Sequence, residues 1–419
     1  MQDTLLLDPV RILRGPGIPL QQGAVLIEGG VLIGFDDEAR ERGIALGLNP
    51  TSAPDQLLAP CLVDPHSLLP TPVSGTLETL TSLRRCAAAG GYGQVALLPR
   101  ADSWRDQPER LFGLLSIDPS DVHLPLWGGF SIGGRGEELA PHADLLEHGA
   151  IGLADDDQMI PIALLERGLA LGEMGSCPVL LAARDPLLQG DGFVREGVET
   201  LRAGWPPDPL ASELQPLNQL LTLQQRHPDR QLRLMNLSTG EAVNALQQVE
   251  ARPLSSVCWW HLLADRGSLG GAEPGWGIRP SLGGKTDRSS LRSALRDGLI
   301  HAVAVHAVPL DQEDMLLPID QRPPGLSGHH LVLPALWSAL VREGSFSVEE
   351  LWQALSFGPS AFLDRPAETL TVGSRRWLLF DPNHHWTVCR DDPAAPGAAN
   401  LPWLGETLQG RVTACGLSR

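Results

Sequence analysis

The chain has 419 residues, 42% of them hydrophobic and 20% charged, with a formal net charge of -18 at pH 7. This length is sufficient for a barrel-sized domain with a smaller second module. The acidic balance argues against nucleic-acid and anionic membrane surfaces as partners, because phosphate groups are bound by clustered Lys and Arg. No apolar run approaches the roughly 18 to 20 residues of a membrane-spanning helix, and the N-terminus lacks a basic signal region, so we expect a cytoplasmic protein.

Residues 1–56 and 369–419 form the two ends of the predicted architecture. Short apolar runs alternate with glycine-rich turns up to residue 35, which predicts strands. Residues 36–56 are acidic and rich in turn formers, and we interpret them as a connection. Strand-like runs return after residue 369, so we expect the two ends to pair in one small composite β-sandwich.

Residues 57–368 show a different pattern, in which apolar strands are separated by helical stretches such as 213–227, 239–251 and 288–298. Strands that alternate with helices are typical of βα units and a parallel sheet. Eight strands are predicted, at 57–64, 94–100, 124–132, 150–156, 178–183, 231–237, 255–260 and 301–307. The sequence therefore predicts an α/β fold whose main domain is a (β/α)8 barrel.

Histidines and a cysteine fall on or near predicted strand ends, where a barrel enzyme places its site. They are His66, His261, His306 and Cys258. A relocated metal site built from them is one reading, but histidines at strand ends are more often hydrogen-bonded structural residues. The adjacent pairs His329-His330 and His384-His385 are expected to diverge, with structural or exposed roles.

The six cysteines lie far apart in the sequence and form no CxxC pair, which predicts buried free thiols. The run Asp155-Asp156-Asp157 lacks the glycine and distal glutamate of a calcium loop, so we interpret it as a solvated strand end.

Several segments in order resemble one family. They include GAVLIEGGVLIGF, LLAPCLVDPH, ETLTSLRRCAAAGGYGQVALLP, MNLSTGEAVNAL and PPGLSGHHLVLPAL. Over nearly its whole length the chain resembles the dihydroorotases of the amidohydrolase superfamily. The resemblance implies an amidohydrolase-type (β/α)8 barrel with a composite sandwich, and a zinc-dependent hydrolase of cyclic amides as the ancestral activity.

Carried over residue by residue, the resemblance keeps only two metal-ligand positions, His66 and Asp155. The other ligand positions hold Leu68, Ala182, Asn236 and Val305, the last of which is also the general acid/base position of the family. The arginine that binds the substrate carboxylate is replaced by Pro70. Two substrate-binding asparagines are replaced by Arg100 and Arg279, which are candidates for holding an anion.

A hydrolytic zinc ion needs three or more protein ligands and an open position for water. Leucine, alanine and valine have no lone pair to offer, so we expect no zinc unless a site is rebuilt from other residues. Lys285 is the only lysine, so a metal-bridging carboxylated lysine could form nowhere else.

We therefore expect a degenerate, non-catalytic dihydroorotase-like protein that serves as a structural or regulatory homologue in pyrimidine biosynthesis. Aspartate carbamoyltransferase is the partner that the resemblance implies, and self-association is the other option. The alternative is a cyclic-amide hydrolase with an altered active site.

Overall fold

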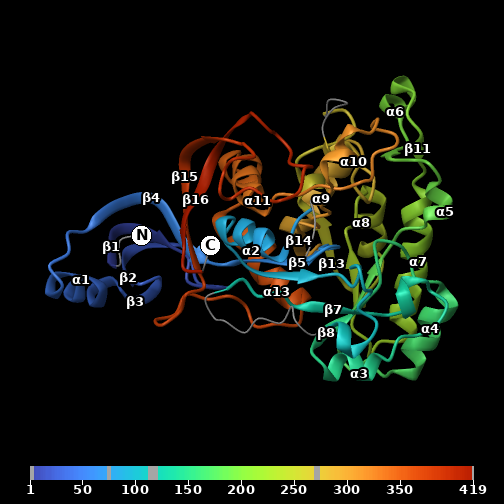
Figure 1. The fold of residues 1–419 in the computed structure, drawn as a ribbon, viewed down its shortest axis with the longest axis horizontal. Coiled ribbons are helices and arrows are strands. Elements are labelled where there is room, and N and C mark those ends of the chain that lie inside the picture. Colours follow the sequence, from blue (N-terminus) through green and yellow to red (C-terminus); the bar gives the residue numbers. More distant parts are fainter. Residues whose placement is uncertain (1–3, 73–76, 112–120, 269–273, 418–419) are drawn as a thin grey trace.

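The computed structural model describes residues 4–72, 77–111, 121–268 and 274–417. A sheet made from both ends of the chain stands at one side of a parallel barrel (Figure 1). The predicted fold class is confirmed.

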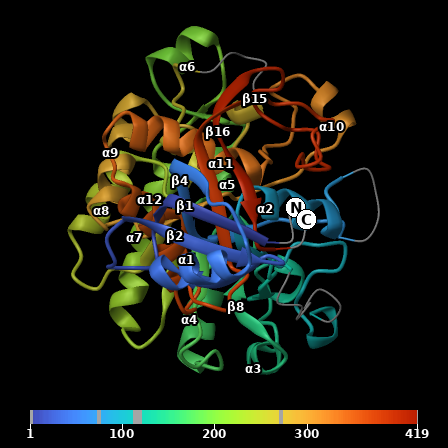
Figure 2. The same ribbon diagram turned by 90° about the vertical axis from the view of Figure 1, so that its left-hand side faces the viewer.

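The terminal sheet has six strands in the order β16-β15-β4-β1-β2-β3. Their bounds are Thr4–Ile12 (β1), Gln21–Glu28 (β2), Val31–Phe35 (β3), Thr51–Pro60 (β4), Trp377–Thr387 (β15) and Thr407–Cys415 (β16). Neighbouring strands are antiparallel, except that β1 and β4 are parallel. Figure 2 shows this sheet from its outer side, where strands from the two ends of the chain lie together. The prediction that both ends of the chain build one module is therefore correct.

Two details of the N-terminal prediction are wrong. The segment interpreted as a connection contains a helix, α1 (Asp36–Ala45), with three acidic residues in its first turn, where the helix dipole favours negative charge. The strand predicted at 57–64 is two strands, because β4 ends at Pro60 in the terminal sheet and β5 (Leu62–Ser67) begins the barrel. Residues 57–69 are all buried, so the apolar run gave no sign of the break at Cys61.

The barrel sheet has eight strands in the order β14-β13-β12-β9-β8-β7-β6-β5, and each strand is parallel to its neighbours in this order. After β5, their bounds are Tyr92–Leu97 (β6), Leu126–Gly129 (β7), Ala150–Ala154 (β8), Val179–Ala182 (β9), Leu232–Met235 (β12), Leu254–Cys258 (β13) and Ala302–Ala304 (β14). Each of the eight overlaps one of the predicted strands.

Hydrogen bonds between the ends of β5 and β14 close the barrel. The Leu68 amide donates to the Ala307 carbonyl at 2.8 Å, and the Ala307 amide donates to the Ser67 hydroxyl at 2.7 Å. The Asp64 carboxylate accepts from the Val305 amide at 3.0 Å. Buried side chains therefore replace part of the ladder between the first and last strands.

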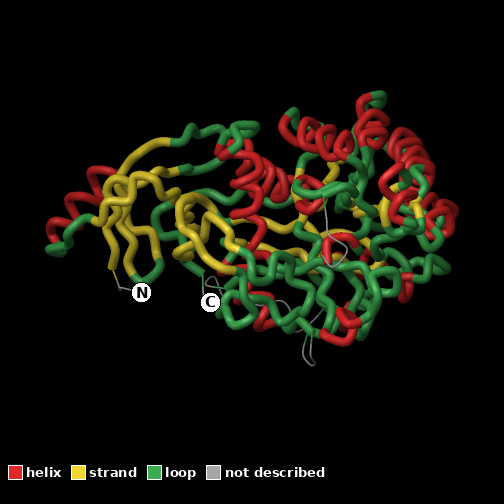
Figure 3. Tube along the Cα trace, turned by 90° about the horizontal axis from the view of Figure 1, so that it is seen from above, coloured by secondary structure: helices red, strands yellow, loops and turns green. Residues whose placement is uncertain are grey.

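Helices surround the barrel, while the terminal sheet stands at one end of the molecule (Figure 3). Their bounds are Leu80–Ala89 (α2), His142–Glu147 (α3), Ile162–Leu171 (α4), Pro186–Gln189 (α5), Val198–Ala203 (α6), Ala211–Arg226 (α7), Gly240–Gln247 (α8), Lys285–Arg296 (α9), Gln312–Leu316 (α10), His329–Leu336 (α11), Val348–Trp352 (α12) and Gly358–Phe362 (α13). Two short parallel strands, β10 (Val194–Arg195) and β11 (Pro207–Asp208), form a separate pair.

Single turns complete the secondary structure. The 3-10 turns are Pro108–Arg110, Ile132–Gly134, Trp259–Leu262 and Pro274–Trp276, and the π-helical turns are Trp337–Arg342 and Gln353–Phe357. Within the described ranges, no helix has both the length and the apolar character needed to cross a membrane.

Candidate site at the barrel mouth

A cavity of about 370 Å³ lies at the carboxyl ends of the barrel strands. It is lined by residues that follow β5, β6, β8 and β14, by the end of β13, and by residues 278–279 and 323–326. The lining residues are Pro70, Arg100, Asp157, Cys258, Ile278, Arg279, His306, Val308, Pro309, Leu310, Pro323, Pro324, Gly325 and Leu326. Parallel barrels carry their sites at this end. Arg100 and Arg279, predicted as anion contacts, are thus brought to one cavity.

His66 lies in β5 and is fully buried. Its Nδ1 is 3.1 Å from Nδ1 of His306, and its Nε2 is 2.8 Å from the Ser256 hydroxyl. Burial lowers the pKa of His66 well below its usual value and that of His306 to about 4. Both imidazoles are therefore neutral near pH 7, and one Nδ1 donates to the other. Both ring nitrogens of His66 are occupied by protein groups.

Asp155 follows β8 and is only 4% exposed, so the prediction of a solvated strand end is wrong for this residue. One carboxylate oxygen accepts from the amides of Phe130 (3.0 Å) and Ser131 (2.9 Å), and the other accepts from the Ser131 hydroxyl at 2.6 Å. Burial raises its pKa to about 6, although these hydrogen bonds oppose the shift. The carboxylate fastens the end of β8 to the end of β7.

Asp156 and Asp157 are also largely buried, and arginines pair with both. Arg100 is 2.9 Å from Asp156, and Asp157 is 3.4 Å from Arg184 and 3.8 Å from Arg279. Burial and the charge of Asp157 raise the pKa of Asp156. Burial also acts to raise the pKa of Asp157, but Arg184 and Arg279 outweigh it and hold that pKa below its usual value. Asp156 and Asp157 are therefore ion-paired, and Asp157 lines the cavity, which corrects the solvated interpretation.

The four positions that the resemblance assigns to lost ligands all lie at carboxyl ends of barrel strands. Leu68 and Ala182 belong to the apolar cluster inside the barrel, and Val305 is 1% exposed. Asn236 is 2% exposed and has a positive φ of 47°. Its side-chain oxygen and nitrogen have no hydrogen-bond partner among the described residues.

The adjacent histidines of α11 point to different partners, as predicted. His329 Nε2 is 3.0 Å from the Asp64 carboxylate, and His330 Nδ1 is 3.3 Å from the Cys86 thiol. All four side chains are buried. These two pairs anchor α11 to β5 and α2.

The remaining candidates lie away from a shared centre. His261 Nε2 contacts the Pro280 carbonyl at 3.0 Å, and His384 and His385 are exposed on β15. Lys285 is exposed at the first residue of α9 and does not line the cavity. Among residues 4–72, 77–111, 121–268 and 274–417, no three His, Cys, Asp or Glu side chains are grouped to hold a metal ion.

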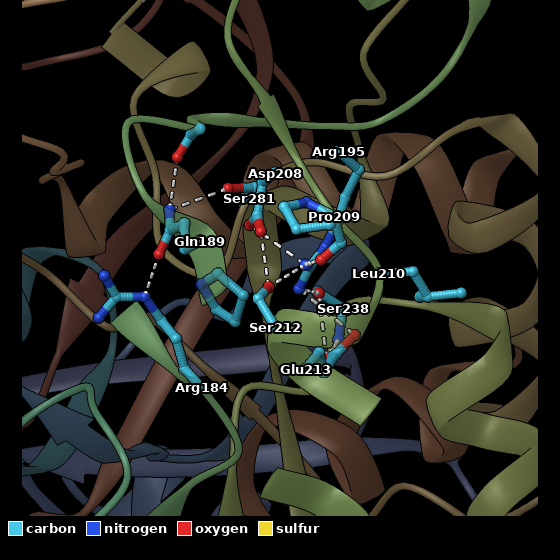
Figure 4. A network of polar contacts seen from close by, with 12 residues as sticks. Arg184, Gln189, Arg195, Asp208, Pro209, Leu210, Ser212, Glu213, Ser238 and Ser281 are labelled. Atoms are coloured by element: carbon cyan, nitrogen blue, oxygen red, sulfur yellow. Dashed lines mark hydrogen bonds and ion pairs between the residues drawn. The ribbon is translucent and has the colours of Figure 1, made fainter. Parts of the chain in front are cut away.

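A second buried polar network lies beside the barrel, and sequence reasoning missed it (Figure 4). The Arg195 guanidinium is 3.1 Å from Asp208 and 3.5 Å from Glu213, and it donates to the hydroxyls of Ser212 (2.7 Å) and Ser238 (3.1 Å). It joins the segment after β9 to the first turn of α7 and to the loop before α8. No sequence motif marks this network, because its members are far apart in the chain. Arg195 and Ser238, which share a hydrogen bond, are 43 positions apart.

No protein-family model matches the chain. A probable dihydroorotase-like protein of Synechocystis sp. is 31% identical over 424 residues, which covers 93% of this chain and 94% of that protein. The chain belongs to the dihydroorotase-like family. This dihydroorotase-like chain is also 28% identical to a dihydroorotase of Anaeromyxobacter dehalogenans over 373 residues, covering 86% and 85% of the two chains.

Solved structures give the same fold. The L-hydantoinase of Arthrobacter aurescens superposes with a TM-score of 0.75 at 16% identity, covering 97% of the dihydroorotase-like chain and 93% of the hydantoinase. The amidohydrolase-type architecture predicted from the sequence is thereby confirmed.

Proposed function

We propose that this dihydroorotase-like chain is a non-hydrolytic, cytoplasmic member of its family that serves pyrimidine biosynthesis as a structural or regulatory partner. Aspartate carbamoyltransferase is the first partner to test, and a second copy of the chain is the other. The observation that carries the proposal is the set of residues at the ends of β5, β9, β12 and β14, which is Leu68, Ala182, Asn236 and Val305.

The surroundings of the two retained ligand positions support this reading. His66 uses both ring nitrogens and Asp155 uses both oxygens in contacts with protein groups. Binding of zinc by either side chain would therefore break hydrogen bonds that are already satisfied, and each buried group left unpaired costs about 1 to 3 kcal/mol. These residues do not fit a hydrolytic zinc site, which holds its metal with three protein ligands and an open position for water.

The apolar replacements also fit a stable barrel without a metal ion. Leu68 and Ala182 pack with Trp127 inside the barrel, and the Trp127 indole nitrogen donates to the Pro65 carbonyl at 3.0 Å. A cluster of imidazoles and carboxylates in the same place would need a cation to offset its charge and desolvation. Apolar side chains remove that requirement.

The experiment is one preparation of the full chain, purified with and without added zinc. We expect less than one zinc per chain by elemental analysis and no hydrolysis of dihydroorotate above a buffer blank. Zinc-dependent hydrolysis would overturn the proposal in favour of a cyclic-amide hydrolase with an altered site. A pulldown with purified aspartate carbamoyltransferase then tests the partner, and sedimentation of the chain alone tests self-association.

A further inference from the structure

Two cysteine side chains meet where the terminal sheet joins the barrel. Cys61 lies between the last residue of β4 and the first residue of β5, and Cys415 is the last residue of β16. Both are in the thiol form, they are 0% and 1% exposed, and they share a hydrogen bond. The sequence predicts buried thiols, but it carries no sign of this contact between distant segments.

The backbone holds the two cysteines on either side of the start of β15. The Cys61 amide donates to the Arg376 carbonyl at 3.4 Å, and Cys415 pairs with Leu378 of β15. The thiol contact therefore bridges from the last strand of the terminal sheet to the point where the chain passes from β4 into the barrel.

The guanidinium of Arg376 lies beside the Cys61 side chain, since both approach the same face of Gly93. Its Nε donates to the Glu368 carboxylate at 2.8 Å, while its Nη1 is buried without a hydrogen-bond partner in the described part of the chain. Burial raises the pKa of the Cys61 thiol well above its usual value, the hydrogen bond with Cys415 adds to the rise, and Arg376 opposes it. The closed pair is therefore protonated and unreactive, and its chemistry requires an opening of the structure.

The end of β16 that carries Cys415 is suited to such an opening. In the terminal sheet β16 is an edge strand, and its neighbour in the strand order is β15. The pairing with β15 skips Thr413, so that this residue forms a bulge between Val412 and Ala414. Because a bulge interrupts the ladder, the short segment after it can open while the rest of β16 stays paired.

We propose that Cys61 and Cys415 form a redox-sensitive clasp, which a low-molecular-weight disulfide such as oxidised glutathione closes as a protein disulfide. When the end of β16 opens, the Cys415 thiolate attacks the oxidant, whose S–S bond breaks and releases one reduced thiol with the proton. When the segment closes, the Cys61 thiolate attacks the Cys415 sulfur of the mixed disulfide and releases the second reduced thiol. The two protein thiols thus lose two electrons and two protons, and the oxidant becomes two thiols.

The new bond brings the sulfur atoms to about 2.05 Å, and the segment of β16 that opens supplies the movement this needs. Once formed, the disulfide fastens β16 to the junction between the terminal sheet and the barrel. The clasp does not involve the barrel mouth, so it holds whether or not the chain hydrolyses a cyclic amide.

The test uses the full chain, first reduced, then incubated with oxidised glutathione and mapped by mass spectrometry of its peptides. We expect a Cys61–Cys415 cross-link and a thermal midpoint about 3 to 5 °C above that of the same sample after reduction, since a disulfide restricts the unfolded chain. Absence of the cross-linked peptide, a cross-link that forms only in urea-unfolded chain, or an unchanged midpoint in the cross-linked protein would each overturn the clasp.

Variants separate the two thiols. Cys61→Ser and Cys415→Ser each keep a hydrogen-bonding group of similar size, and each should lose both the cross-link and the shift in midpoint. The matched control is Cys389→Ser, which removes an exposed thiol and should keep both. If a serine variant fails to fold, the peptide map of the parent still decides the proposal.

The order of the two steps is also measurable. With Cys61→Ser, glutathione should become trapped on Cys415, and this should be at least about tenfold faster than its attachment to Cys61 in Cys415→Ser, because only the end of β16 opens locally. Equal rates in the two variants would contradict the opening of β16 and, with it, the clasp.

Discussion

The substitution Asp155→Asn tests whether this carboxylate is a structural clamp with a raised pKa. An asparagine can keep the same contacts, because its oxygen accepts from the amides of Phe130 and Ser131 and its nitrogen faces the Ser131 hydroxyl. What it removes is the ionisation of a side chain that is 4% exposed. The variant should therefore fold as the parent does and differ from it in the pH dependence of its stability.

The magnitude follows from the pKa of about 6 in the folded protein against the usual 3.8. Because the folded pKa is the higher one, the folded state binds more protons between these values, and the parent loses stability as pH rises through them. At 1.36 kcal/mol per pKa unit the loss is ~3 kcal/mol at pH 7 relative to pH below 4. Roughly half of it is already present at pH 5.

Urea unfolding of parent and variant at pH 5 and pH 7.5 measures this contribution. We expect Asp155→Asn to gain about 1.4 kcal/mol relative to the parent between the two pH values, since only the parent carries the ionisation cost. Asp155→Ala is the control for the contacts. It should lose about 1 to 3 kcal/mol at both pH values because the buried Ser131 amide loses its acceptor, whereas the Phe130 amide keeps the Ala154 carbonyl at 2.8 Å. A constant offset between parent and Asp155→Asn would refute the raised pKa.

Three further predictions concern packing, the buried arginine and metal. Leu68→Ala should lower the free energy of unfolding by about 2 to 5 kcal/mol in urea, because the side chain is buried inside the barrel; a loss below about 1 kcal/mol would mean that the barrel mouth is loosely packed. Arg195→Ala should cost about 3 to 5 kcal/mol, since it leaves Asp208 and Glu213 buried beside each other without their cation. Arg226→Ala removes an exposed pair and should cost at most about 1 kcal/mol, so equal losses would contradict the argument. Chelation should leave the thermal midpoint of the parent unchanged within about 1 °C, whereas a bound structural metal would add to stability by mass action.

The strands were predictable because a barrel buries them on both faces. Eight apolar runs separated by helical patterns could be counted without knowing how the strands pair, and the parallel order followed from the alternation itself. The break at Cys61 could not be found in this way, because residues on both sides of it are apolar and buried in different modules. Apolar patterning reports burial and does not report which sheet a strand joins.

Sequence reasoning located several residues that the structure places at the carboxyl ends of the barrel strands, but it did not predict their contacts. The resemblance located Arg100 and Arg279, which do line one cavity, and it located Asp155 at the end of a barrel strand. It could not reveal that the Asp155 carboxylate turns to the neighbouring strand end, because that depends on amides of Phe130 and Ser131 that carry no sequence signal. The pairing of His66 with His306 was equally hidden, since these residues are 240 positions apart.

The strand order of the terminal sheet has a consequence for synthesis of the chain on the ribosome. Strand β4 lies between β1, which is made early, and β15, which is made after the whole barrel. Until β15 emerges, one edge of β4 has no partner, and an unpaired edge is a site of intermolecular association. β4 continues through Cys61 into the first barrel strand, so the nascent chain carries this open edge next to the folding barrel. Premature termination before Trp377 would leave that edge permanently uncovered, and such fragments should aggregate even when all eight barrel strands are present.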